Sequence, residues 1–151
     1  MIEIPPDRLI LLDSCTLIQL QRANATGVAI DAAYGLKSRV ERPLLSTVVE
    51  GEVNALARTW NWGSSKIAKL EQNLAQLVRI PAGDPSIVSA YSKLWSQQAF
   101  IGKKLGENDT WIAASAVAIG AVLLTCDSDF LLAASSVEVA YFDVSKGAPG
   151  V

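Results

Sequence analysis

Short apolar runs separated by longer amphipathic stretches dominate the chain, and this alternation predicts strands that are interleaved with helices. The run at 8–12 follows two prolines, and the run at 121–125 is bounded by a glycine and an acidic turn. Uninterrupted apolar runs of this length are typical of strands that are buried on both faces of a parallel sheet. With the weaker segments included, the expected strands cover 8–12, 44–46, 78–80, 121–125 and 137–142.

Capping residues and helical periodicity between these runs predict the helices. The pair Ser64–Ser65 suits a helix start, and leucine and isoleucine then recur at helical spacing. Pro85 suits the first turn of another helix, and Gly120 suits a C-cap. The expected helices cover 16–22, 32–40, 48–59, a segment after 64, a segment after 84, and 107–120.

This order of elements predicts a three-layer α/β/α fold with a central, mostly parallel sheet of about five strands. The chain has 151 residues, the usual size of one domain, and contains no linker, so a single domain over 1–151 is expected. The stretch 146–151 is rich in glycine and is predicted to be a loose tail.

Composition narrows the chemistry. Half of the residues are hydrophobic, so a substantial core can form. The formal net charge is −2, and this charge does not favour a protein that binds long nucleic acid through its phosphate backbone. The absence of histidine excludes Ser-His and Cys-His nucleophiles and makes zinc hydrolysis improbable. The two cysteines suit free thiols. No basic leader region and no apolar run of about 20 residues is present, so a cytoplasmic protein without membrane contact is expected.

Carboxylates stand where the predicted parallel strands end. Asp13 ends the first strand, Asp127 ends the fourth, and Asp129 follows two residues later. Glu52 lies early in the helix after the second strand, and Asp109 lies in the first turn of the helix before the fourth. Ligands of parallel α/β sheets bind outside the carboxyl ends of the strands. If the first and fourth strands are neighbours, these acids converge at one edge.

Each acid also has a purely structural interpretation. Asp13 suits a helix cap, Asp109 a helix dipole, Asp127 and Asp129 a solvated turn, and Glu52 a wet helix face. Their combination favours a cation, because two like charges 4 Å apart repel by ~4 kcal/mol at an effective dielectric of 20. Oxygen-only ligands favour Mg²⁺ or Mn²⁺, which commonly serve phosphoryl chemistry.

Four motifs carry a family resemblance: LLDSCTLI, STVVEGEVNALA, ENDTWIAASAVAIGA and LLTCDSDF. In their order and spacing the sequence resembles PIN-domain ribonucleases, particularly the VapC-type toxins of prokaryotic toxin–antitoxin pairs, over nearly the whole chain. The resemblance implies a PIN-like domain. It also implies a Mg²⁺- or Mn²⁺-dependent endoribonuclease that cleaves RNA phosphodiesters, with an antitoxin partner and a homodimeric state.

The same resemblance implies roles for particular residues. The catalytic and metal-binding acids fall on Asp13, Glu52, Asp109 and Asp127, with Asp129 as a further metal ligand. Glu52 rather than Glu50 fits the family spacing after Ser46. Supporting positions fall on Ser14, Asn108 and Thr125.

Several alternatives stay open. Lys103 and Lys104 precede the third acid and suit either substrate phosphates or a solvated turn, and Trp60 and Trp62 suit either inward packing or a partner contact. The family role could instead be RNA maturation without an antitoxin, or a non-catalytic regulatory module. A phosphatase of the haloacid dehalogenase type is disfavoured, because its second acid would stand at position 15, where the chain has Cys15.

Overall fold

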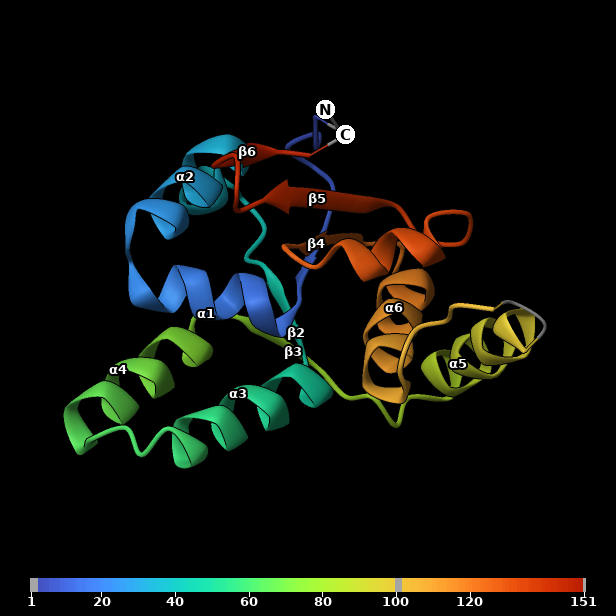
Figure 1. Ribbon diagram of the computed structural model, residues 1–151, viewed down its shortest axis with the longest axis horizontal. Helices are drawn as coiled ribbons and strands as arrows, with labels where there is room; N and C mark the ends of the chain where they lie inside the picture. The colour runs from blue at the N-terminus through green and yellow to red at the C-terminus, as the bar shows by residue number, and fades with distance from the viewer. Residues whose placement is uncertain (1–2, 100–101, 151) are drawn as a thin grey trace.

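A six-stranded sheet organises the molecule in the computed structural model, which describes residues 3–99 and 102–150. The strand order is β3-β2-β1-β4-β5-β6 (Figure 1). The strands are β1 (Ile10–Leu12), β2 (Leu44–Ser46), β3 (Val78–Ile80), β4 (Val122–Thr125), β5 (Val139–Asp143) and β6 (Ala148–Pro149). β1 to β5 are parallel, which confirms the predicted α/β architecture and all five predicted strands.

The helices cover both faces of the sheet in a three-layer α/β/α arrangement. They are α1 (Ser14–Arg22), α2 (Ala25–Tyr34), α3 (Thr47–Thr59), α4 (Ser64–Ala75), α5 (Pro85–Gln98) and α6 (Glu107–Ile119), with short 3₁₀ turns η1 (Leu36–Ser38) and η2 (Ser128–Ala133). Gly120 ends α6 with φ of +67°, a conformation that glycine adopts readily. Within the described residues, no helix is long and apolar enough to cross a membrane.

One predicted helix start and one predicted helix cap are wrong. The second helix was expected over 32–40, but α2 begins seven residues earlier because the Asn24 side chain accepts a hydrogen bond from the Gly27 N–H at 2.9 Å and caps it. α2 ends at Gly35, which has φ of +60°. The N-cap of α4 is Gly63, which has no side chain to offer, rather than the serine pair that follows it.

The central strands are the most deeply buried. β1 pairs with β4 so that Leu12 lies opposite Leu124, and both side chains are buried. Fully burying one such leucine contributes about 1.5–3 kcal/mol relative to its exposed state. This pairing places the carboxyl ends of β1 and β4 side by side, which is the condition for the predicted convergence of acids.

The prediction of a loose tail over 146–151 is wrong for most of that stretch. Ala148–Pro149 forms β6, which pairs antiparallel with Phe142 and Asp143 of β5. The Gly150 N–H also donates to the Tyr141 carbonyl at 2.7 Å. Gly147 has φ of +63° and allows the chain to turn back onto the sheet edge. Residue 151 lies outside the described residues.

Candidate active site

Asp13 is a structural cap and a member of the acidic group at the same time. Its side chain is 2% exposed, directly after β1. One carboxylate oxygen accepts the Thr16 N–H at 2.9 Å and caps α1, while the other accepts from the Thr125 hydroxyl and the Cys15 thiol. Burial raises the pKa of Asp13, although these donors act in the opposite direction. The acid is therefore rigidly held in a fixed orientation.

Glu52 approaches Asp13 from α3. Its Oε2 accepts from the Ser14 hydroxyl at 3.4 Å, and its Oε1 is buried without a hydrogen-bond partner among the described residues. Burial raises the pKa of Glu52, and the negative charges of Asp109 and Asp13 raise it further. A buried carboxylate oxygen without a donor is costly, so this atom is suited to binding a cation.

Glu50 lies two residues earlier on α3 and is engaged elsewhere. Its Oε2 lies 2.7 Å from Nε of Arg79 on β3. The N–H direction does not make this a well-aligned hydrogen bond, but at that distance the two charges compensate each other. The geometry therefore separates the two glutamates and directs Glu52, not Glu50, toward Asp13.

Asp109 enters the group from the first turn of α6. α6 has Gly106 as its N-cap and lacks a side-chain cap, so its first-turn N–H groups favour negative charge there. Burial nevertheless raises the pKa of Asp109, followed by the charges of Asp127, Asp13 and Asp129. These mutual effects show that acids from β1, α3, α6 and the end of β4 share one region.

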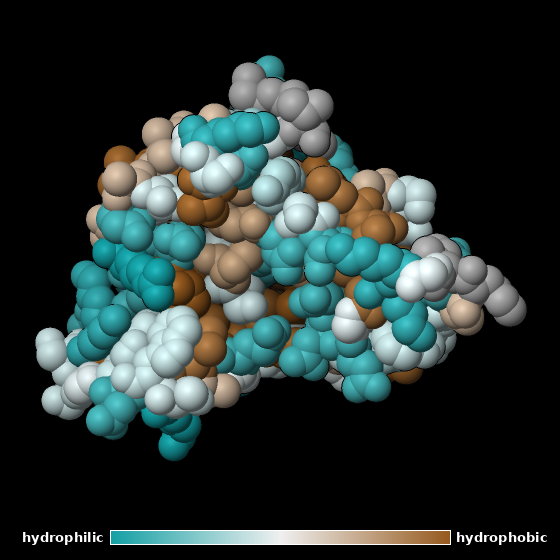
Figure 2. All heavy atoms as spheres, viewed as in Figure 1, coloured by the Kyte–Doolittle hydropathy of each residue, from teal (hydrophilic) through white to brown (hydrophobic). Residues whose placement is uncertain are grey.

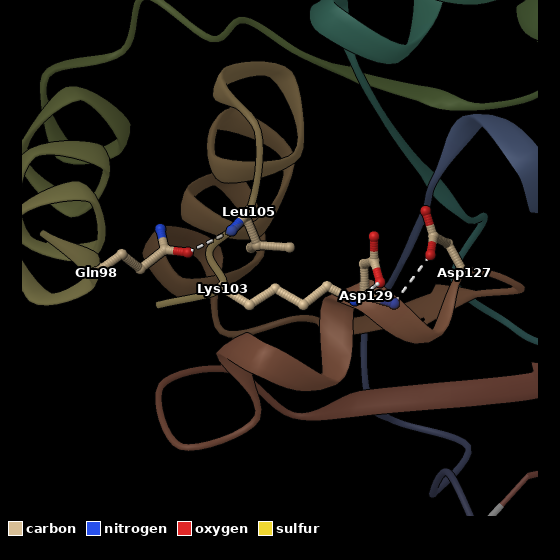
Figure 3. Close-up of polar contacts among 5 residues, drawn as sticks. All are labelled: Gln98, Lys103, Leu105, Asp127 and Asp129. Atoms are coloured by element: carbon tan, nitrogen blue, oxygen red, sulfur yellow. Dashed lines mark hydrogen bonds and ion pairs between the residues drawn. The ribbon is translucent and has the colours of Figure 1, made fainter. Parts of the chain in front are cut away.

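Asp127 and Asp129 form the wall after β4. Asp127 caps η2 by accepting the Asp129 N–H at 2.9 Å, and its own N–H donates to the Thr125 hydroxyl at 2.8 Å. Asp129 is half-exposed and forms an ion pair with Lys103, with 2.9 Å between Oδ1 and Nζ. Figure 3 shows the Lys103 side chain extending from the segment before α6 toward Asp129. Lys103 thus contacts an acid of the site directly.

Gln98 organises the same segment and was not predicted from the sequence. This buried residue at the end of α5 accepts the Leu105 N–H at 2.7 Å (Figure 3). Its Nε2 also donates to the Thr110 hydroxyl at 3.4 Å. It therefore anchors the chain on both sides of the N-terminus of α6. A lone glutamine carries no sequence signal for such a contact, which depends on how α5 and α6 pack.

The other predicted residues lie in different surroundings. Ser14 and Thr125 are within hydrogen-bond distance of the acids, as described above. Asn108 is exposed, and its side chain makes no hydrogen bond to the described part of the chain. Lys104 points to a different place: its Nζ lies 5.0 Å from the ring centroid of Trp95. Lys103 therefore lies beside the acidic group, and Lys104 lies away from it.

The ligand atoms that the acids offer suit a hard divalent cation, but the acids do not enclose an ion completely. All of the acids offer oxygen, the ligand atom that Mg²⁺ and Mn²⁺ prefer, and the buried Oε1 of Glu52 lacks any other partner in the described chain. Across residues 3–99 and 102–150, no three acidic or thiol side chains lie close enough together to enclose an ion as they stand. The acids are gathered but do not form a closed coordination shell.

The molecule combines a parallel α/β sheet with acids from four elements that gather at the carboxyl ends of the strands. Together these features define a class of α/β proteins with an acidic site at the sheet edge. Residues 10–135 match the PIN domain family, and the chain belongs to that family. None of the curated proteins is similar enough in sequence to match.

Solved structures show the same fold at low sequence identity. A chain of the VapBC2 complex of Rickettsia felis, bound to a DNA fragment from its promoter, is 18% identical with a TM-score of 0.76, over 89% of this chain and 99% of that one. DNA-bound VapBC of Salmonella typhimurium is 16% identical with a TM-score of 0.73, over 87% and 96%. Mycobacterium tuberculosis VapC20, a toxin that cleaves the sarcin–ricin loop, is 19% identical with a TM-score of 0.63, over 86% and 98%.

Proposed function

We propose that this protein is a Mg²⁺- or Mn²⁺-dependent endoribonuclease that acts as the toxin of a toxin–antitoxin pair. The observation that carries the proposal is the group formed by Asp13, Glu52, Asp109 and Asp127, whose charges act on one another. Membership of the PIN domain family and the fold shared with VapBC complexes and VapC20 support it. We expect a protein antitoxin as partner, a homodimer and a cytoplasmic location.

The chain's own residues would prepare this site in defined ways. The three donors on Asp13 fix its carboxylate, and the Ser14 hydroxyl orients Glu52. A divalent cation, when bound, supplies the positive charge that neutralises the acids and lowers the pKa of a water for attack on phosphorus. We assign that cation to Asp13, Glu52, Asp109 and Asp127. Asp129 would contribute only after releasing Lys103, which would then be available for a substrate phosphate.

The nuclease is tested by incubating purified protein with a mixed structured RNA in Mn²⁺, in Mg²⁺ and in EDTA. Asp109→Asn tests the site, and Asp7→Asn, at an exposed acid outside it, is the matched control. We expect cleavage by wild type and Asp7→Asn, loss in EDTA and loss in Asp109→Asn. Equal cleavage by Asp109→Asn would reject the site. A parallel calorimetric titration with Mn²⁺ alone should show binding that Asp109→Asn weakens at least ten-fold.

The toxin role needs a separate test, because an RNA maturation nuclease would pass the first one. Induced expression in a bacterial host should stop growth for wild type and leave it unaffected for Asp109→Asn. Normal growth at equal amounts of soluble wild-type protein, with RNA cleavage intact in vitro, would favour RNA maturation. Binding of neither Mn²⁺ nor RNA would favour a non-catalytic module.

A further inference from the structure

A second charged feature lies away from the acids, in a cleft of about 770 Å³ between the end of α1 and one face of α4. Polar side chains of both helices line it, namely Gln21, Arg22, Ser65, Lys66, Lys69 and Gln72. No acidic side chain of the described chain takes part in the lining. The cleft therefore carries three positive charges in a protein whose net charge is −2.

The cations of this cleft have no acidic partners. Among residues 3–99 and 102–150, neither Arg22, Lys66 nor Lys69 lies within 4.0 Å of a carboxylate oxygen. Elsewhere in the described part of the chain, five cations are engaged in ion pairs: Arg8, Lys37, Arg79, Lys103 and Lys146. The N-terminus of α4 also borders the cleft and adds partial positive charge. The C-terminus of α1 adds partial negative charge on the opposite side, beside Arg22, so the excess positive charge lies mainly along α4. Positive charge without a carboxylate partner favours a polyanionic ligand.

Two tryptophans lie against these cations. Trp60 and Trp62, on the turn between α3 and α4, have ring centroids 6.1 Å apart. The Arg22 guanidinium lies 5.7 Å from the Trp60 centroid, and the Lys66 ammonium lies 4.0 Å from that of Trp62. Trp62 packs partly against the core, whereas Trp60 is 47% exposed. Each of the two alternatives for this pair therefore holds for one ring: Trp62 packs inward, and Trp60 faces solvent.

The cleft and the acids are separated along the same pair of helices. α1 begins directly after Asp13 and ends at Arg22, and α3, which packs beside it, carries Glu52 near its middle and ends directly before Trp60. Figure 1 shows both helices running from the centre of the molecule toward the end that carries α4. Figure 2 shows near-white and hydrophilic side chains covering that end on this face. At 1.5 Å per residue, the separation along either helix is roughly 12 Å.

We propose that this cleft binds single-stranded RNA that extends from the acidic site, with phosphates on Arg22, Lys66 and Lys69 and a base stacked on the open part of Trp60. Exposed aromatic rings beside a positively charged groove are how proteins hold single strands without reading sequence. The choice of RNA rests on the proposed function. The choice of a nucleic acid over an acidic peptide rests on Trp60, since charge alone would satisfy a peptide.

Binding is measured by fluorescence anisotropy with a labelled, unstructured 20-nucleotide RNA in EDTA, so that no cleavage is needed. The double variant Lys66→Ala/Lys69→Ala removes two cleft charges. Its matched control, Arg42→Ala/Lys93→Ala, removes two exposed cations elsewhere that also make no ion pair with the described chain, and it has the same net charge. Trp60→Ala removes the ring, and Trp60→Phe restores one. Each protein is titrated between 50 and 200 mM salt after its fold has been checked by circular dichroism.

We expect the cleft variant to bind about ten-fold more weakly than the control. We also expect the slope of log affinity against log salt to be smaller by about 1.4, since each lost phosphate contact removes ~0.7 for a single strand. Trp60→Ala should lose roughly five-fold to a hundred-fold and Trp60→Phe should recover most of it. Equal affinity and equal slope for the cleft variant and the control would overturn the proposal. Full RNA affinity in Trp60→Ala would also overturn it, because a site that binds by charge alone, as for an acidic peptide, does not need the ring.

The outcome is independent of the catalytic proposal. Cleft-dependent binding in EDTA, combined with no cleavage in any metal, would reject the nuclease and retain the RNA cleft. Metal-dependent cleavage combined with cleft-independent binding would retain the nuclease and reject the cleft.

Discussion

Replacing Thr125 with valine tests whether one buried hydroxyl holds the acidic site together. Thr125 is fully buried at the end of β4. Its hydroxyl donates to Oδ2 of Asp13 and accepts the Asp127 N–H at 2.8 Å. Valine has almost the same shape without the oxygen, so Thr125→Val removes both hydrogen bonds and opens almost no cavity.

The size of the effect follows from these two bonds. A hydrogen bond to a charged group contributes about 1.5–3 kcal/mol, and a neutral one about 0.5–1.5 kcal/mol. We therefore expect Thr125→Val to lower the free energy of unfolding by about 3 kcal/mol. For a chain of this size, that corresponds to a decrease in Tm of roughly 6–12 °C.

The pH dependence identifies which bond is responsible. Burial raises the pKa of Asp13, and the Thr125 hydroxyl partly opposes this, so Thr125→Val should raise that pKa further. The destabilisation should be full when Asp13 is ionised, and it should shrink as the pH falls through the folded-state pKa of Asp13, first in the variant and then in wild type.

Urea unfolding in EDTA, repeated at decreasing pH from 8 until acid alone unfolds the protein, measures this directly. Thr125→Ser is the matched control, because it keeps the hydroxyl and loses only a methyl group. It should cost about 1 kcal/mol. If valine and serine were equally destabilising, or if the valine effect did not change with pH, the hydroxyl would not be supporting an ionised Asp13.

Three further predictions concern the same region. Burial raises the folded-state pKa values of Asp13, Glu52 and Asp109, and neighbouring negative charges raise those of Glu52 and Asp109 further, so the folded state binds more protons than the unfolded chain. In EDTA these groups should make the protein more stable to urea as the pH falls from neutral through those raised values. Mn²⁺ at 100 times its Kd should stabilise wild type by about 2.7 kcal/mol in thermal unfolding, and an equal increase in Asp109→Asn would place the ion elsewhere. The Cys15 and Cys126 thiols lie within hydrogen-bond reach of each other, and both are free. Hydrogen peroxide should therefore convert them into a disulfide with release of two waters, and mass spectrometry should show the loss of two hydrogens. Activity should fall until dithiothreitol is added, and two thiols unchanged after peroxide would contradict this prediction.

Strands were the easiest part of the fold to predict, because a strand that is buried on both faces has a continuous run of apolar residues in the sequence. The runs at β1 and β4 have this form, and both strands are buried throughout. β6 was missed because a two-residue strand in a glycine-rich stretch owes its existence to an available sheet edge, not to its own composition. The start of α2 was missed because its alanine and glycine residues give little amphipathic contrast.

The gathering of the acids could be predicted in part, because parallel strands end at the same edge of a sheet. It also required β1 and β4 to be neighbours, which the sequence left open and the strand order supplies. Side-chain pairing could not be predicted in the same way. The ion pair of Glu50 with Arg79 depends on the edge strand β3, and the ion pair of Lys103 with Asp129 depends on the path of the chain before α6. Those contacts are set by tertiary packing, which leaves no periodic mark in the sequence.

The double duty of Asp13 has a consequence for how this protein can change over evolutionary time. One oxygen of Asp13 begins α1, and the other receives donors from the neighbouring strand end and from Cys15. A lineage in which the activity is lost cannot replace Asp13 without also lowering the stability of the fold. Asp109 caps nothing and is destabilised by its neighbours, so its loss is structurally tolerable. Silenced descendants should therefore retain the aspartate at 13 and differ at 109.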